Sequence, residues 1–410
     1  GRFVTQDMYH AYFLAYFHKI TRIISPQIPL TRSMSFYPVL ISALSVLFAF
    51  IIGKKIAGNV GGFFAALMLA VSQSFVGRTL FGHADSDAWV VFFPLLITLL
   101  FLEALESENK IKSIAYSLLG GIVVGFFSFS WSGWWYIFDF LLGVAGVTFI
   151  YFLFIYRNKI KTGIKSLWST ELSNIVIASL VFFISSAIFV IIFHNFAEFL
   201  IAFNPLGFSS SVKAPVTPSL WPNVLTTVAE LNPGSYDQVV SSMGGKLLWY
   251  LGLLGIILAT LKRDKKNRID IKYSVLLLFW LASTSYASLL GIRFTLLVAP
   301  AFSIAFGTTL GISYKYISKW AAKELHIHRT ITSTIFILLL LMFYVNPING
   351  SMNAAKHDIP LVNDAWYNSL TSIKTNSTED AIITSWWDFG HHFKVIADRP
   401  VTFDGTTQTS

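Results

Sequence analysis

Cysteine is absent from the 410 residues of this chain. The chain therefore cannot form a disulfide, use a thiolate nucleophile or bind a metal through sulfur, and any metal site must use oxygen or imidazole ligands. Charge is also scarce, because only 12% of the residues are charged whereas soluble domains contain roughly 25%. At 54% hydrophobic residues, the chain needs lipid to cover its surface. This composition excludes a water-soluble globular protein and indicates a polytopic membrane protein.

Apolar runs long enough to cross a ~30 Å hydrocarbon layer as helices recur along most of the chain. They cover residues 37–53, 60–76, 88–104, 113–129, 134–154, 174–194, 246–261, 273–290, 295–312 and 331–346. We therefore predict an all-α polytopic membrane domain over residues 1–346, with about ten spans.

The net charge of +9 is explained by the loops between these runs rather than by a nucleic-acid partner. Eighteen Lys and Arg residues lie in one set of alternating loops, at 54–55, 110–112, 157–165, 262–272 and 315–329. The other set holds four, Arg78, Lys213, Lys246 and Arg293. Basic loops of membrane proteins stay in the cytoplasm. We therefore predict that residues 1–36, 77–87, 195–245 and 347–410 are external.

The ends of the chain differ from the spans. Seven acidic residues follow Pro347, together with a β-rich stretch at Ala381–Ser385. We interpret residues 347–410 as the start of a soluble external mixed α/β domain that is cut off at Ser410. Because Gly1 is neither Met nor followed by a signal-like apolar run, we expect that the amino end of a longer chain is missing.

Three acidic residues on the predicted external side are candidates for a metal site. Asp85 and Asp87 form a D-x-D pair directly before a span, and Asp7 lies in the first external segment. Such a pair can share one divalent cation, and a third carboxylate would complete a hard-oxygen site suited to Mg²⁺ or Mn²⁺. Alternatively, Asp85 caps the following helix, since Asp is favoured at helix N-termini. A cap accounts for one acid and leaves the other two unexplained.

Two further charged residues stand out on the same side. Glu230 is carried by the long 195–245 loop, whose five prolines argue against a helical span. Taken alone, Glu230 is either a solvated loop acid or a catalytic group. Arg293 lies at the external end of two spans, against the charge rule. Its guanidinium either reaches toward the lipid headgroups or binds a phosphate bidentately.

The least ordinary string of the tail is Trp386-Trp387-Asp388-Phe389-Gly390, which by itself could be core and turn residues. It resembles the W-W-D-Y-G signature of the catalytic subunit of oligosaccharyltransferase, the enzyme of protein N-glycosylation, with Phe389 in place of the usual Tyr. In chain order, Asp7 resembles the family's first outer-loop aspartate, Asp85 and Asp87 its second D-x-D-type motif, Thr227 to Glu230 its S/T-x-x-E loop motif, and Arg293 its donor-phosphate arginine. The five motifs extend over nearly the whole chain.

The resemblance implies a glycosyltransferase C-type fold and the transfer of an oligosaccharide from a polyprenyl-phosphate or polyprenyl-pyrophosphate lipid to the Asn of Asn-X-Ser/Thr. The roles it implies are catalysis by Asp7 and Glu230, Mn²⁺ or Mg²⁺ binding by Asp7, Asp85 and Asp87, donor-phosphate binding by Arg293, and sequon recognition by Trp386, Trp387 and Asp388. The expected partners are the lipid-linked donor, acceptor polypeptides and membrane lipid. We expect a prokaryotic, archaeal plasma membrane with the active site on its external face.

Two alternatives remain open from the sequence. Another glycosyltransferase that uses a polyprenyl-phosphate sugar, such as a protein O-mannosyltransferase, would share Asp7 and the phosphate-binding cation but would not need W-W-D-F-G. A transporter would fit ten spans, yet it predicts ionisable residues near the bilayer midplane, and the spans are nearly free of charge. The resemblance also implies thirteen spans, two more between Asp87 and Glu230 than the hydropathy predicts.

Overall fold

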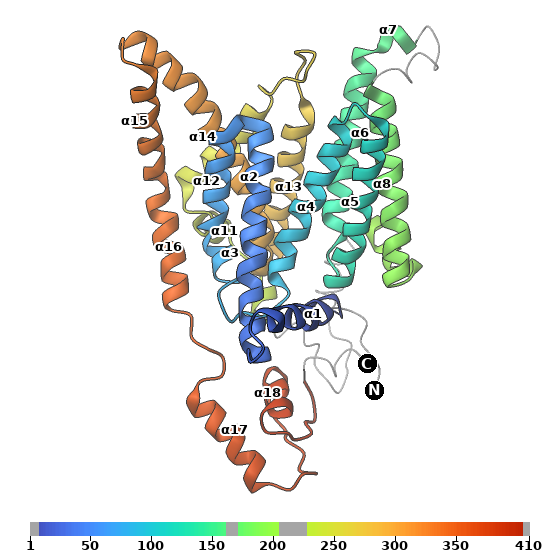
Figure 1. Ribbon diagram of the computed structural model, residues 1–410, viewed down its shortest axis with the longest axis vertical. Coiled ribbons are helices and arrows are strands. Elements are labelled where there is room, and N and C mark those ends of the chain that lie inside the picture. Colours follow the sequence, from blue (N-terminus) through green and yellow to red (C-terminus); the bar gives the residue numbers. More distant parts are fainter. Residues whose placement is uncertain (1–7, 161–170, 205–227, 405–410) are drawn as a thin grey trace. The chain divides into compact units, whose positions relative to one another are not determined.

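The computed structural model describes residues 8–160, 171–204 and 228–404. The chain divides into two compact units. The first, called the bundle here, comprises Gly1–Gly207 and Pro233–Ala355, and the second, called the tail unit, comprises Phe208–Asn232 and Lys356–Ser410. Long helices make up the described part of the bundle (Figure 1), whereas the tail unit contains short elements.

The long helices of the bundle follow the predicted apolar runs. They are α2 (Leu30–Ala70), α4 (Asp87–Glu106), α5 (Lys110–Ser130), α6 (Trp135–Ile155), α8 (Glu171–Phe193), α12 (Lys246–Ala259), α13 (Ile271–Leu290), α14 (Thr295–Glu324), α15 (Arg329–Leu341) and α16 (Val345–Lys356). Shorter elements connect them: α3 (Gln73–Val76), α7 (Arg157–Ile160), α9 (Phe196–Leu200), η2 (Ile201–Phe203), α11 (Tyr236–Ser242), η5 (Ile292–Phe294) and η6 (Met342–Tyr344). Each predicted run lies mainly in one or two of these helices.

The all-α polytopic fold is thereby confirmed. Among the described residues, eight helices are long and apolar enough to cross a membrane, and a ninth span results if the bent pair α11 and α12 is counted as one. The count falls below ten because α2 contains two of the predicted runs, and because α12 has only 14 residues.

Helix α2 folds back on itself at Ala57 and Gly58, where the backbone leaves helical geometry. Gly58 has φ +75°, a left-handed conformation that costs glycine little. A Cβ atom added to Gly53 would lie 2.8 Å from the Cβ atom of Ala65. Residues this far apart in a straight helix are separated by about 18 Å, so the contact requires a reversal. The two arms are the two spans predicted at 37–53 and 60–76.

Small residues let the central helices of the bundle approach closely. The first 18 residues of helix α14, from Thr295 to Ile312, are buried. The helix packs against α2, α12 and α13, while α5 packs against α4 and α8. A Cβ atom on Gly307 of α14 would lie 2.4 Å from the backbone nitrogen of Ala65, and one on Gly311 2.5 Å from the Cα atom of Gly61. Interfaces of this kind are typical of helices packed in a membrane.

The first external segment contains a helix that the hydropathy did not predict. Helix α1 (Met8–Ile24) lies across the end of the bundle rather than along it (Figure 1). The ring of Tyr9 packs 5.2 Å from that of Trp89 and 5.4 Å from that of Phe93, both in α4. Burial raises the pKa of the Tyr9 phenol to about 12, so this anchor is uncharged at neutral pH.

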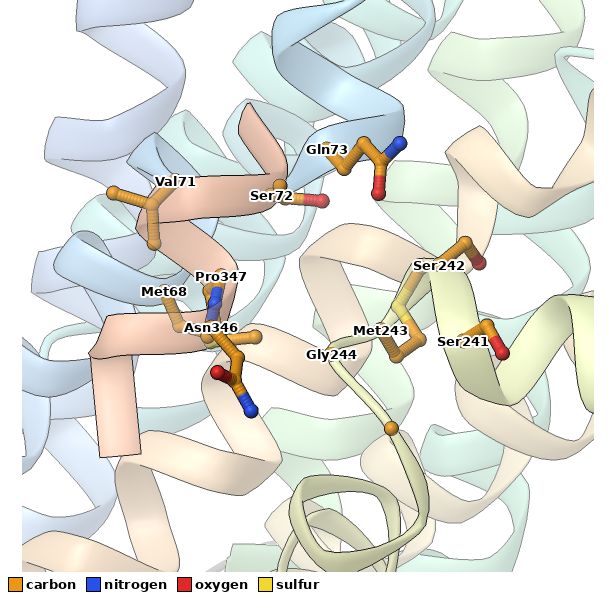
Figure 2. A pocket seen from close by; sticks show the side chains of 12 residues that line it. Met68, Val71, Ser72, Gln73, Ser241, Ser242, Met243, Gly244, Asn346 and Pro347 are labelled. Atoms are coloured by element: carbon orange, nitrogen blue, oxygen red, sulfur yellow. The ribbon is translucent and has the colours of Figure 1, made fainter. Parts of the chain in front are cut away.

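A small pocket of about 230 Å³ opens at the turn between α11 and α12, which meet at 85°. Gly244 and Gly245 make this turn with φ values of +97° and +101°, which favour glycine. Figure 2 shows the side chains that line the pocket, and they come from α2, α3, the end of α11, the turn and α16. The lining contains no charged residue, and five of its residues are polar: Ser72, Gln73, Ser241, Ser242 and Asn346.

The tail unit contains α17 (Asp364–Asn376), α18 (Gly390–Val395) and two 3₁₀ turns, η4 (Ala229–Leu231) and η7 (Trp387–Phe389). Arg399 is 6% exposed and donates hydrogen bonds to the carbonyl oxygens of Lys374 and Ser377. No strand forms among the described residues of this unit. The stretch expected to be β-rich, Ala381–Ser385, contributes only a bridge between Ile383 and Val401.

Candidate active site

The bundle places a buried carboxylate between two arginines. Asp87 is the first residue of α4, and its side chain is only 5% exposed. Its Oδ1 atom lies 3.3 Å from Nη2 of Arg293, which belongs to η5, and its Oδ2 atom lies 3.4 Å from Nη1 of Arg78. A buried carboxylate is stable only when it is paired, so these cations allow Asp87 to remain ionised. The contact with Arg293 joins residues 206 positions apart.

Asp85 is exposed and does not cap α4. The cap residue of α4 is Ser86, which makes no side-chain capping hydrogen bond. The Oδ1 atom of Asp85 instead accepts a hydrogen bond from the backbone nitrogen of Ser86 at 2.6 Å, and the Tyr37 hydroxyl donates to the Asp85 carbonyl oxygen. The cap alternative for Asp85 is therefore wrong.

Helix α1 lies next to the D-x-D pair through His10. Nε2 of His10 lies 2.8 Å from the carbonyl oxygen of Ala84, and Nε1 of Trp89 donates to Nδ1 of His10 at 3.1 Å. Because Nδ1 accepts, Nε2 must carry the proton and donate it to Ala84. His10 thus fixes the first turn of α1 beside Asp85. Asp7, three positions before His10, lies outside the described residues.

In the tail unit, the W-W-D-F-G motif forms an exposed turn. The side chain of Trp386 is 53% exposed, and Asp388 is exposed as well. Phe389 stacks on Trp366 at 5.2 Å, which attaches the turn to α17. Gly390 leaves no room for a side chain, since a Cβ atom would lie 2.7 Å from the Cβ atom of Asp404. The motif is therefore held by its Phe and Gly and presents Trp386 and Asp388 to solvent.

Glu230 also belongs to the tail unit, in η4, where it is partly exposed. Thr227, the first residue of its motif, lies outside the described residues. The structure therefore brings together Asp87 and Arg293 within the bundle, with Asp85 two residues from Asp87. Glu230, Trp386, Trp387 and Asp388 share the other unit.

The comparison with known families fits this arrangement. Residues 10–346 match the family described as "Oligosaccharyl transferase STT3, N-terminal". The chain belongs to this family.

Curated relatives of this oligosaccharyl transferase family member include two archaeal enzymes named dolichyl-phosphooligosaccharide-protein glycotransferase. The one from Methanococcus voltae is 25% identical over 96% of this chain and 52% of its own length. The one from Methanocaldococcus jannaschii is 28% identical over 84% of this chain and 43% of its own length. The chain thus spans about half the length of the curated relatives it matches.

Solved structures share the fold of this oligosaccharyl transferase family member. The apo oligosaccharyltransferase of Archaeoglobus fulgidus matches with a TM-score of 0.72 and 16% identity, over 99% of this chain and 57% of that one. ArnT from Cupriavidus metallidurans, bound to undecaprenyl phosphate, matches with a TM-score of 0.51 and 12% identity, over 96% of this chain and 75% of that one.

Two residues of this site were not among those predicted from the sequence. Arg78 pairs with Asp87, and His10 joins α1 to the D-x-D segment. A signal for Arg78 existed, because it is one of the few basic residues in the loops predicted to be external, as Arg293 is. His10 carried no such signal, since a lone His on a helix is usually a packing residue.

The donor atoms present suit a hard cation. Asp85 and Asp87 offer carboxylate oxygens, which Mg²⁺ and Mn²⁺ prefer, and the family member has no cysteine to favour a softer metal. Within residues 8–160, 171–204 and 228–404, no group of three or more His, Asp or Glu side chains is placed to hold a metal ion. The third predicted ligand, Asp7, lies outside that part of the chain.

Proposed function

We propose that this protein transfers an oligosaccharide from a polyprenyl-phosphate or polyprenyl-pyrophosphate lipid to the side-chain nitrogen of Asn in Asn-X-Ser/Thr. The observation that carries the proposal is the pairing of Arg293 with Asp87, which joins the cation expected at the donor phosphate to the acid expected at the metal. Relatives named dolichyl-phosphooligosaccharide-protein glycotransferase support it. So does a neighbour of the same fold from Archaeoglobus fulgidus, solved with an inhibitory peptide and a dolichol-phosphate.

Arg293 binds the phosphate of the lipid donor in this proposal. The guanidinium presents several N–H donors in a planar fork that matches phosphate oxygens. Its contact with Asp87 fixes the side chain before the donor arrives, so little conformational entropy is lost on binding. As the sugar departs from the lipid, Arg293 stabilises the negative charge that develops on the leaving phosphate.

Asp7, Asp85 and Asp87 hold a divalent cation, which we propose to be Mn²⁺ or Mg²⁺. A neighbour of the same fold has been solved as a complex with Zn and sulfate, which supports a divalent metal in this family. When bound, the cation supplies further positive charge for the leaving phosphate.

EDTA should abolish transfer, and Asp87→Asn should raise the metal concentration needed for half-maximal activity, because a neutral amide replaces an anionic ligand. Full activity of Asp87→Asn at limiting metal would refute the ligand role.

Asp7 and Glu230 act on the acceptor amide. The amide nitrogen is a poor nucleophile because its lone pair is delocalised into the carbonyl group, as in the peptide bond, where this resonance creates a barrier of ~18–20 kcal/mol. Carboxylates that accept both amide N–H bonds twist or polarise the group and so free the lone pair. The nitrogen then attacks the anomeric carbon of the sugar, the bond from that carbon to the lipid phosphate oxygen breaks, and one amide proton passes to a carboxylate of Asp7 or Glu230.

Trp386, Trp387 and Asp388 recognise the Ser or Thr of the acceptor. The exposed Asp388 carboxylate accepts a hydrogen bond from the hydroxyl, and the neighbouring indoles exclude water from it. A site built for a hydroxyl strongly rejects a ligand without one, because its own polar group would then be left unpaired. We place the active site on the external face of an archaeal plasma membrane, and the distribution of basic loops supports the external orientation.

One assay tests the whole proposal. Membranes that contain the protein are incubated with a lipid-linked oligosaccharide, a divalent metal and a fluorescent peptide that contains Asn-X-Thr. We expect a slower-migrating glycopeptide on a gel, and none with the matched Gln-X-Thr peptide. Transfer to the Thr hydroxyl of the Gln peptide would instead identify an O-glycosylating enzyme and overturn the proposal.

A further inference from the structure

A large cavity opens at the end of the bundle opposite to Asp87. Asp87 begins α4 and Glu106 ends it, so the two lie about 30 Å apart along the helix. Around Glu106 lies a cavity of about 960 Å³, bounded by the turn of α2, the ends of α4 and α6, the start of α8 and the loop before α13. By the charge rule this end is cytoplasmic. No residue proposed for catalysis or substrate binding lines it.

The lining of this cavity carries an excess of positive charge. Its basic residues are Lys54, Lys55, Lys110, Lys262, Arg263, Lys265, Lys266, Arg268 and Lys272, and its acidic residues are Glu106, Glu108, Glu171, Asp264 and Asp270. Nine basic and five acidic residues leave a net charge of +4. This surplus attracts an anion to the cavity.

Ion pairs with the five acids fix the walls. Lys272 lies 2.5 Å from Asp270 and 3.2 Å from Glu106, which ties α13 to α4. Arg268 contacts Glu171 at 2.9 Å and packs over the ring of Phe152 at 4.8 Å, which ties the loop to α8 and α6. The cavity is therefore held open by its own charges, and its shape is set before a ligand binds.

Four lining cations, Lys54, Lys110, Lys262 and Arg263, make no ion pair with any acid in the described part of the chain. They lie on three separate segments, the α2 turn, the start of α5 and the loop before α13, so they surround the cavity. A bound anion would give these cations an opposite charge within the cavity.

The inner wall of the cavity is apolar. It is formed by the side chains of Phe50, Ile51, Leu105, Phe152 and Ile175, which come from α2, α4, α6 and α8. A ligand that matches both the lining cations and the apolar wall has a negatively charged head and a hydrocarbon portion. Inorganic phosphate satisfies the cations but leaves the apolar wall uncovered.

We propose that this cavity binds an anionic phospholipid, with the phosphate of its headgroup among the four unpaired cations and an acyl chain against the apolar wall. Basic pockets between spans on the cytoplasmic side suit anionic lipid headgroups. The charge rule alone explains why cations gather at this end, but it does not require them to surround a cavity. Lys315, Lys319 and Lys323 of α14 are also on the basic side and do not line it.

Native mass spectrometry tests the proposal with the full chain in a neutral detergent. Phosphatidylglycerol and phosphatidylcholine are titrated against the protein, against Lys54→Gln/Lys262→Gln/Arg263→Gln, and against the matched control Lys315→Gln/Lys319→Gln/Lys323→Gln. Each cation near an anionic lipid strengthens its binding about fivefold. We therefore expect the cavity variant to lose at least about tenfold in affinity for phosphatidylglycerol, the control to keep the wild-type affinity, and phosphatidylcholine to bind all three proteins weakly and equally.

Three results would overturn the proposal. An equal loss in both triple variants would show that only the overall surface charge matters. Competition by glycerol phosphate at the same concentration as the lipid would show that the ligand is a water-soluble phosphate. Should the triple variant not fold, the single variant Lys262→Gln removes one half-buried cation that makes no ion pair in the described part of the chain. Unchanged phosphatidylglycerol affinity in that variant would also refute the site.

Discussion

At the scale of single residues, one buried carboxylate holds together the end of the bundle that carries the D-x-D pair. Asp87 uses one oxygen for Arg293 and the other for Arg78. The two arginines come from segments more than 200 positions apart in the chain. Because both contact Asp87, they fix the loop before α4 against η5. The chemistry proposed for Arg293 therefore depends on a residue, Arg78, that does not itself need to touch the substrate.

Substitution of Arg293 tests the donor role. Arg293→Ala removes one charge-assisted phosphate contact, which is worth about 1.5–3 kcal/mol, and kcat/KM for the lipid donor should fall roughly ten- to a hundredfold. Lys246→Ala is the control, because Lys246 is predicted to be external and pairs only with the exposed Asp237, at 3.7 Å. Its donor kinetics should match the wild type. A defect of Arg293→Ala confined to the peptide KM would assign Arg293 to the acceptor instead.

Asp388 provides a test of acceptor recognition. Asp388→Ala should weaken the binding of Asn-X-Thr peptides by about 1.5–3 kcal/mol, the range for a hydrogen bond to a charged group. Asn-X-Ala peptides should bind almost as before, since they lack the hydroxyl. Isothermal titration with both peptides measures the difference, which cancels general damage to the tail unit. Equal losses for the two peptides would remove Asp388 from the acceptor site.

At the scale of helices, close approach between backbones holds the centre of the bundle. Gly307 and Gly146 allow a matched comparison, because both are helical and the same methyl group is added to each. A Cβ atom on Gly307 would lie 2.6 Å from the carbonyl oxygen of Gly61, whereas one on Gly146 would meet nothing within 4 Å. Overpacking against backbone costs about 1–3 kcal/mol. Gly307→Ala should therefore lower the melting temperature in detergent, and Gly146→Ala should not. Equal shifts would show that α14 can move away from α2 at no cost.

The helices also show which features the sequence reveals. Long apolar runs predicted the described helices of the bundle that are long and apolar enough to cross a membrane, because lipid requires the backbone to satisfy its own hydrogen bonds. Helix α1 escaped this reasoning because polar residues such as His10, His18 and Lys19 interrupt its apolar face. The pairing of Asp87 with Arg78 and Arg293 could not be predicted either. It depends on how α4 packs beside η5, and a pattern of residue types along the chain carries no information on that packing.

At the scale of the whole molecule, function depends on which end of the bundle faces the exterior. The end that carries Asp87 and Arg293 and the end that carries the basic cavity are separated by the length of α4, about 30 Å. The two ends therefore lie on opposite sides of the membrane whichever way the protein is inserted. Eighteen basic residues against four favour the orientation with Asp87 outside.

Cysteine labelling decides the orientation without interference, because the native chain contains no cysteine. Phe81 is 54% exposed and lies six positions before Asp87, while Lys265 is exposed and pairs with Glu108 just beyond the other end of α4. A membrane-impermeant maleimide should label Phe81→Cys in intact cells, and Lys265→Cys only after the membrane is permeabilised. Thr375→Cys, exposed on α17, reports on the tail unit and should behave like Phe81→Cys. Labelling of Lys265→Cys from outside would place the D-x-D segment in the cytoplasm and contradict glycosylation of exported proteins.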